Sequence, residues 1–200
     1  MDEEGRARAL GQLELIEQMI LEGRRTTERW GWTFVLWGVG HTVALLWSEL
    51  GGAPWAWGVC MSACGLVMGG ASVLRRKRSP DKRPAQSRAL GAIWEAFSWS
   101  LGVAIAAAVI GGARGYFENG VFYGQFFALM GAANYASAVI LRWPLQRALG
   151  VAWWLAALAA LLAPPACVPW IFLGMAALGE IGFGAWLMVR ERQEEALSGL

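Results

Sequence analysis

The sequence contains few of the residues on which enzyme catalysis and metal binding depend. Its 200 residues include a single His and 3 Cys, and only 16% of them are charged. One His cannot supply the two imidazoles of a bis-His haem within one chain, and no HExxH, GxSxG or Walker pattern is present. Three Cys do not indicate a disulfide framework. We therefore expect neither an enzyme nor a bound cofactor.

Apolar residues dominate the rest of the composition. The set AVILMFWYC makes up 56% of the chain, with 26 Gly and 13 Trp, and the mean hydropathy is +0.41. A soluble protein of this size could not hide so much apolar surface. The composition predicts an all-α integral membrane protein whose first partner is the lipid bilayer. The net charge of +2 gives no reason to expect nucleic-acid binding.

Six apolar stretches are about long enough to cross the hydrocarbon core as helices, which takes about 20 residues. They lack the period-2 alternation of a membrane barrel, and a helix satisfies its own backbone hydrogen bonds. The predicted bundle of six transmembrane helices comprises Trp30–Leu50, Trp55–Leu74, Ala89–Gly111, Gly120–Leu141, Arg147–Ala163 and Cys167–Val189.

The basic residues predict the orientation of this six-helix domain, residues 30–189. With the amino terminus inside, all of the 17 Lys and Arg residues except Arg114 lie on the cytoplasmic side. This asymmetry matches the positive-inside rule. Both flanking segments, residues 1–29 and the tail 190–200, are therefore expected in the cytoplasm.

A short repeated sequence leaves two interpretations of the topology open. Arg88-Ala-Leu-Gly opens the third stretch and Arg147-Ala-Leu-Gly opens the fifth. The chain could consist of three tandem helical hairpins, as in transporters built from parallel repeats. Alternatively, each helix that runs outward simply begins with an interfacial Arg.

The amino-terminal segment, residues 1–29, has the pattern of an amphipathic helix. Apolar residues cluster on one side of it, and acidic residues outnumber basic ones, which disfavours adsorption to anionic lipid. We expect this helix to dock on protein. The expected function is association with another copy or with another inner-membrane protein. The apolar cluster comprises Leu10, Leu13, Ile16, Met19 and Ile20.

Residues 14–20 read Glu-Leu-Ile-Glu-Gln-Met-Ile, and the Trp-rich stretch Arg-Trp-Gly-Trp-Thr-Phe-Val-Leu-Trp-Gly follows at 29–38. This opening resembles that of small, uncharacterised multi-helix inner-membrane proteins of bacteria. The resemblance covers about the first fifth of the chain. It implies a multi-pass protein of the bacterial inner membrane and carries over no activity or site residue.

Four polar residues of four different stretches form the first candidate site. At 1.5 Å per helical residue, His41, Glu180, Asn134 and Glu95 lie about 16, 15, 12 and 10 Å from the inner interface. Ionisable groups at such depth are functional candidates. The alternative function is therefore a small, proton-coupled transporter with Glu180 and Glu95 as proton carriers. In the structural alternative the four residues merely hydrogen-bond one another, and Glu95 extends to the interface.

A second candidate site lies within the second stretch. Cys60, Met61, Cys64 and Met68 share one helical face, and soft sulfur ligands suit Cu(I), so a soft-metal pathway is a minor alternative function. Ordinary packing is the competing interpretation. Gly65 and Gly69 form a GxxxG pattern there, which predicts close helix packing.

Overall fold

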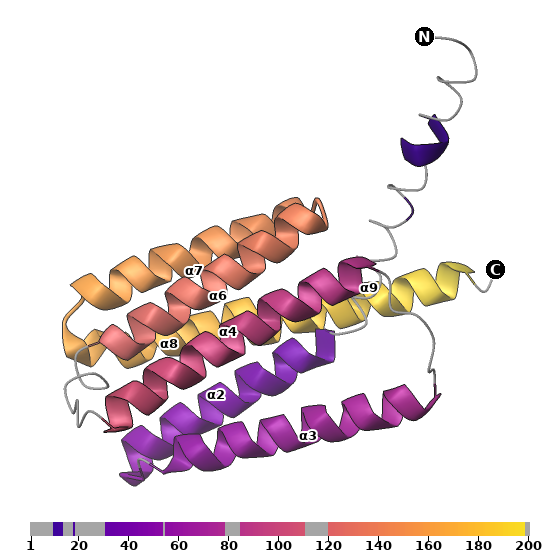
Figure 1. Ribbon diagram of the computed structural model, residues 1–200. Helices are drawn as coiled ribbons and strands as arrows, with labels where there is room; N and C mark the ends of the chain where they lie inside the picture. Colours follow the sequence, from indigo (N-terminus) through magenta and orange to yellow (C-terminus); the bar gives the residue numbers. More distant parts are fainter. Residues whose placement is uncertain are drawn as a thin grey trace.

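The computed structural model describes residues 10–13, 18, 31–53, 55–78, 85–110 and 120–198, and every regular element in these ranges is helical. The all-α prediction is thus confirmed for the described residues (Figure 1). The elements in chain order are α2 (Gly31–Gly51), α3 (Ala56–Arg78), α4 (Ala85–Ile110), α6 (Val121–Ile140), α7 (Pro144–Leu162), the short 3₁₀ turn η1 (Pro165–Cys167), α8 (Val168–Met175), the π-helical η2 (Ala176–Gly182) and α9 (Phe183–Ser198).

The helices lie on the six apolar stretches, and their ends have local causes. The helix α7 ends at Leu162 immediately before the Pro164–Pro165 pair, whose rings cannot continue it. At the other end of the chain, α8, η2 and α9 run on as one helix to Ser198. Most of the predicted tail 190–200 is therefore helical, because residues 190–197 are mainly strong helix formers without Gly or Pro.

Four helices of the described part are long and apolar enough to cross a membrane: Ala56–Leu74, Arg88–Ala107, Pro144–Leu162 and Pro165–Gln193. Many large apolar side chains point outward, among them Leu66 at 78% exposure and Ile110 at 86%. Such a surface is what lipid, rather than water, favours. The helices α2 and α6 are of similar length but carry polar residues such as His41 and Asn134. A six-span arrangement therefore stays a prediction.

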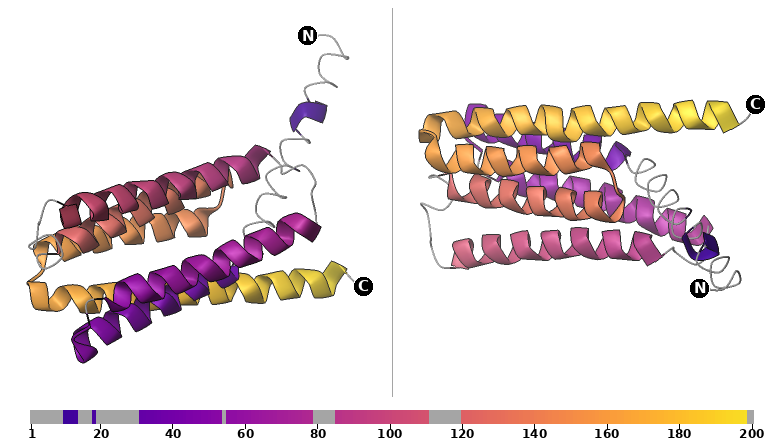
Figure 2. Two further views of the ribbon diagram at one scale, coloured as in Figure 1. Left: turned by 60° about the horizontal axis from the view of Figure 1, so that its bottom comes forward. Right: turned by 90° about the horizontal axis from the view of Figure 1, so that it is seen from above.

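The helices form two layers, with α3, α2 and the α8–η2–α9 helix in one and α4, α6 and α7 in the other (Figure 2). The helix α2 packs against α3, η2 and α9, while α6 packs most extensively against α7 and also contacts α4. The most extensive contact is between α6 and α7, which belong to two different predicted hairpins. The packing therefore does not divide the chain into three separate hairpins.

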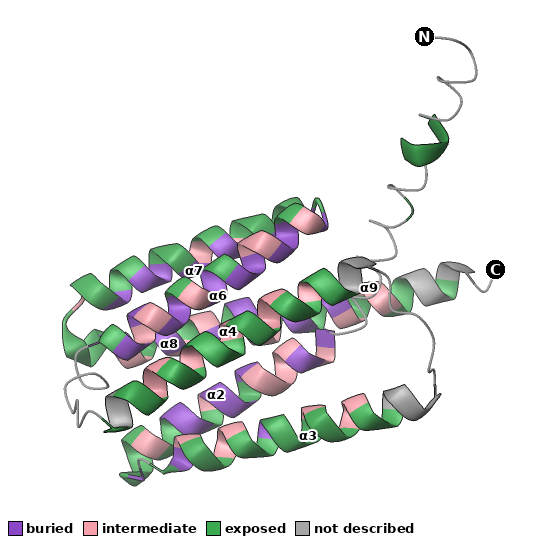
Figure 3. Cartoon of the chain, viewed as in Figure 1, coloured by how far each residue is buried: buried purple, intermediate pink, exposed green. Residues whose placement is uncertain are grey.

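Burial is concentrated in the central helices. Figure 3 shows mostly buried and half-buried residues along α2 and α6, whereas α3 and α4 are mainly exposed. The principal core lies between the two layers and is strongly aromatic. Its fully buried large side chains include Phe127, Trp153 and Phe172.

Close helix contact uses glycines other than the predicted pair. A Cβ atom added to Gly38 of α2 would lie 2.8 Å from the Glu180 Cβ atom and 2.7 Å from Cγ1 of Ile181, so α2 meets η2 almost backbone to backbone. A Cβ atom on Gly65 or Gly69 would meet nothing within 4 Å. The GxxxG prediction is wrong for packing inside the described chain, because this face of α3 points away from α2.

The predicted amphipathic helix of residues 1–29 falls largely outside the described residues. Only residues 10–13 and 18 of it are described, and they are helical. Leu10 and Leu13 are both exposed. Docking of this segment on protein therefore stays a prediction.

Candidate functional site

A buried His–Glu pair is the central polar feature of the bundle. Nδ1 of His41 on α2 lies 2.8 Å from Oε2 of Glu180 on η2, and both residues are buried. The structure thus brings together two of the four residues of the predicted polar layer. Because a short hydrogen bond joins an imidazole to a carboxyl group, the pair can hold and exchange a proton.

The π-helical segment η2 positions the carboxyl group. A π-helix accommodates one more residue per hydrogen-bonded turn than an α-helix, and such segments occur often at functional sites. Here the segment spans Ala176–Gly182 and directs the Glu180 side chain toward α2. The absence of a side chain at Gly38, three residues before His41, gives the carboxylate-bearing segment room to approach.

Four aromatic rings surround the imidazole. The ring of His41 lies 5.2 Å from Phe126, 5.7 Å from Phe172, 5.8 Å from Trp37 and 6.2 Å from Trp57, centroid to centroid. These rings come from α2, α3, α6 and α8. Aromatic walls keep the local dielectric constant low, which strengthens the hydrogen bond to Glu180 and makes an unpaired charge there costly.

Sequence reasoning did not identify this aromatic shell. The four rings belong to separate helices, and aromatic residues are so frequent in this chain that their number alone points to no site. The helical spacing of Phe126 and Phe172 indicates a buried face, but not which residue that face covers.

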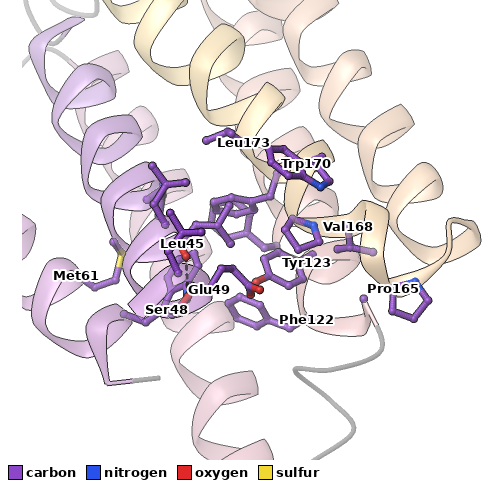
Figure 4. Close-up of a pocket in the computed structure, with 18 of the residues that line it drawn as sticks. Leu45, Ser48, Glu49, Met61, Phe122, Tyr123, Pro165, Val168, Trp170 and Leu173 are labelled. Carbon is purple, nitrogen blue, oxygen red and sulfur yellow. Dashed lines mark hydrogen bonds between the residues drawn. The ribbon is translucent and has the colours of Figure 1, made fainter. Parts of the chain in front are cut away.

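A cavity of about 1310 Å³ extends from His41 to the ends of the helices near residues 48–52 and 165–170. Figure 4 shows part of its lining, with Ser48 and Glu49 of α2 close to Phe122 and Tyr123 of α6. Glu180 does not line the cavity, so His41 separates that carboxyl group from the open space. A proton could therefore pass between the cavity and Glu180 through the imidazole.

Two hydrogen bonds connect residues of α2 and α3 at the end of the cavity away from His41. Nε1 of Trp57 donates to the Ser48 hydroxyl oxygen at 3.2 Å, and that hydroxyl donates to the Leu45 carbonyl oxygen at 2.9 Å. These bonds tie the end of α2 to the start of α3. They also fix the indole ring of Trp57, which contacts the Phe172 ring at 5.5 Å.

The other two members of the predicted polar layer lie elsewhere. Asn134 is fully buried on α6, and its Nδ2 donates to the Met130 carbonyl oxygen at 2.9 Å within the same helix. Glu95 is exposed on α4, and the hydrogen bond of the pair joins His41 to Glu180 without it. The expectation of one four-residue relay is wrong for Glu95, because equal depth does not mean that two helices turn the same face inward.

The sulfur-bearing face of α3 is occupied by packing contacts. Nε1 of Trp37 donates to Sδ of Met68 at 2.8 Å, and Sγ of Cys64 donates to the Leu36 carbonyl oxygen at 3.7 Å. Cys60 is a half-buried free thiol, and Met61 lines the cavity. Across the described residues, no three His, Cys, Asp or Glu side chains are grouped to hold a metal ion. The geometry gives the soft-metal pathway no support.

Comparisons of the chain with protein-family models, with curated proteins and with solved structures gave no match. The resemblance of residues 14–38 to small bacterial membrane proteins therefore stays a prediction. The His41–Glu180 pair and the cavity beside it are the features of the described chain that bear on function.

Proposed function

We propose that this protein is a small, proton-coupled membrane transporter. The observation that carries the proposal is the buried His41–Glu180 pair beside a large cavity that His41 lines. A binding space for a solute and a proton-exchanging pair next to it are the two parts that coupled transport requires.

In this proposal the chain crosses a bacterial inner membrane six times, with both termini in the cytoplasm. The distribution of Lys and Arg supports the orientation, because only Arg114 would lie outside. The central position of α2 and α6 supports the six spans, since lipid contact falls mainly on the more apolar helices α3, α4 and α7. The cavity then opens toward the outer face.

The proton chemistry of the pair supports coupling. With one shared proton the pair is neutral overall, whether it is an imidazole with a carboxylic acid or an imidazolium with a carboxylate. A second proton gives it a net positive charge, and loss of the shared proton gives it a net negative charge. Both charged forms are costly inside the membrane. A charged solute in the cavity next to His41 would favour one protonation state over the other.

The test is transport by purified protein in proteoliposomes under an imposed proton gradient, using labelled sugars, amino acids, organic cations and organic anions. We expect at least one class to accumulate, and Glu180→Gln to reduce its rate at least tenfold, because the amide cannot exchange a proton. The matched control is Glu95→Gln, which changes an exposed glutamate on α4. Transport by Glu180→Gln at the wild-type rate would contradict the proposal, as would no accumulation of any class.

Association is a second candidate function, and the outer surface of α3 favours it. Gly65 and Gly69 have open space where a Cβ atom would be, so another helix could approach this face closely. In this alternative α3 and the amino-terminal segment bind a second copy or another inner-membrane protein.

Native mass spectrometry of the gently solubilised protein tests association. We expect a complex that Gly69→Leu and deletion of residues 2–28 each weaken, while Leu66→Ala on the same exposed helix serves as a substitution that adds no bulk. Complexes of unchanged mass and abundance in both variants would exclude this alternative.

A further inference from the structure

The described lining of the cavity is mainly apolar and aromatic, and it carries a carboxylate but no basic side chain. Most of its side chains are apolar, and its aromatic rings are Trp57, Phe122, Tyr123, Phe126, Trp170 and Phe172. Glu49 is the carboxylate among the described lining residues, and none of these is Lys or Arg. An anionic ligand would find no opposite charge there.

Three pairs among these aromatic rings meet edge to face. Trp57 meets Phe172 at 76°, Tyr123 meets Phe172 at 69° and Trp57 meets Phe122 at 79°, with centroids 5.3 to 6.5 Å apart. Each such pair covers only one face of one of its two rings, so the other ring faces of Trp57 and Tyr123 are not covered by these pairs. A cation over such a face is attracted by the ring quadrupole, most strongly over Trp.

Among the described lining residues, Glu49 supplies the formal negative charge. Its side chain lies close to Tyr123 on the lining of the cavity (Figure 4). Within the described chain Glu49 has no cationic partner, since the salt bridge found there joins His41 to Glu180. A carboxylate beside aromatic faces, with no Lys or Arg among the described lining residues, is a binding environment for an organic cation.

The structure also disfavours other ligands. A sugar needs many hydrogen-bonding groups, and the polar side chains on the lining are few, namely His41, Ser48, Glu49 and Tyr123. An inorganic cation needs several oxygen ligands, and no acidic cluster is present among the described residues.

We propose that the cavity binds an amphipathic, monovalent organic cation, with its charge between Glu49 and the ring faces and its apolar part toward His41. This inference rests on the proposed transport function, for which it names the substrate class. Access from the lipid is compatible with the fold, because Gly58 and Met61 of α3 and Leu101 and Ile105 of α4 all line the cavity. These two helices pack mainly on α2 and on α6 rather than on each other.

The test uses two ions of the same shape and opposite charge, tetraphenylphosphonium and tetraphenylborate. Equilibrium binding is measured on the full chain in phosphatidylcholine nanodiscs, and binding to empty nanodiscs is subtracted. We expect the cation to bind at least tenfold more tightly than the anion, and Glu49→Gln to weaken binding of the cation about tenfold. Glu95→Gln is the matched control and should bind like the wild type. Because Glu49 is exposed, folding should survive its substitution.

Equal affinities for the two ions, or undiminished cation binding by Glu49→Gln, would overturn the inference. The same experiment separates it from the proposed function. We expect Glu180→Gln to retain tetraphenylphosphonium binding while losing proton-driven transport. If Glu180-dependent transport of another solute class occurs without cation binding, the substrate assignment fails and the transporter proposal stands. If the cation binds but no gradient drives transport, the transporter proposal fails instead.

Discussion

Gly38 shows how a single residue controls the geometry of the buried pair. It lies three residues before His41, on the face of α2 that meets η2, and any Cβ atom there would collide with Glu180 and Ile181. Overfilling a tight contact forces the backbones apart and costs about 1–3 kcal/mol. The hydrogen bond between His41 and Glu180 depends on this approach.

The substitution Gly38→Ala is therefore expected to destabilise the protein by about 1–3 kcal/mol and to impair proton coupling. Thermal unfolding in detergent and transport in proteoliposomes measure the two effects. The control is Gly65→Ala, which adds the same methyl group where nothing lies within 4 Å, and we expect it to change stability by no more than about 1 kcal/mol. Equal behaviour of the two variants would show that the close approach is unimportant.

For individual residues, the sequence predicted the site in part: two of the four residues in the predicted polar layer form the buried pair. Counting residues from the interface gives the depth of a side chain, and His41 and Glu180 at similar depth do meet. The count says nothing about which way a side chain points around the helix axis. Glu95 therefore lay within the predicted layer although its side chain is exposed on α4.

Among the elements, η2 has the largest effect on the site. Its π-helical turns carry Glu180, which faces α2, and Leu187 of the following α9 is also fully buried. Because a π-helical turn holds more residues than an α-helical one, η2 shifts the helical register between α8 and α9. The hydrophobic pattern does not reveal such a segment, since apolar residues occur on every side of it.

Deleting Ala177 should convert η2 toward a regular α-helix. Ala177 is exposed, so the deletion removes no buried side chain, and the shortened segment can close with α-helical turns between α8 and α9. The direction of the Glu180 side chain within the segment then changes, and we expect the His41–Glu180 hydrogen bond to be lost. We expect transport to be abolished and the unfolding temperature to fall.

The control at the same position is Ala177→Leu, which keeps the chain length and places an apolar side chain on an exposed surface. It should transport like the wild type and unfold at a similar temperature. A deletion variant with wild-type stability and transport would show that the π-helical register is dispensable.

Element boundaries were more predictable than element contacts. Pro164 and Pro165 mark the end of α7, since a missing N–H group acts locally. The partner of each helix depends on packing between segments far apart in sequence. The sequence therefore did not predict that α6 would pack most closely with α7, or that the GxxxG face of α3 would point outward.

The whole molecule has the polarity expected for a lipid environment. Its buried residues include polar ones such as His41, Asn134 and Glu180, whereas large apolar side chains are widely exposed. In the proposed orientation the short connection after α7, which contains Cys167, lies outside, and the start of α2 lies inside. The three cysteines of the chain are free and differ in exposure.

Labelling of intact cells with a membrane-impermeant maleimide tests this orientation. We expect reaction at Cys167, which is exposed, and none at Cys60 or Cys64, which lie within α3. The variant Cys167→Ser should abolish the signal. Labelling of Cys167 only after the inner membrane is permeabilised would reverse the orientation.

The unequal hydropathy of neighbouring helices has a consequence for biosynthesis. In a six-span arrangement, α2 and α6 are the least apolar spans and would partition poorly into lipid alone, because each carries a buried polar side chain. Each is followed by a more apolar helix, α3 or α7, against which it packs closely. The ribosome therefore delivers a weakly inserting segment and then its partner. Insertion of α2 with α3, and of α6 with α7, as pairs would shelter His41 and Asn134 from lipid during synthesis.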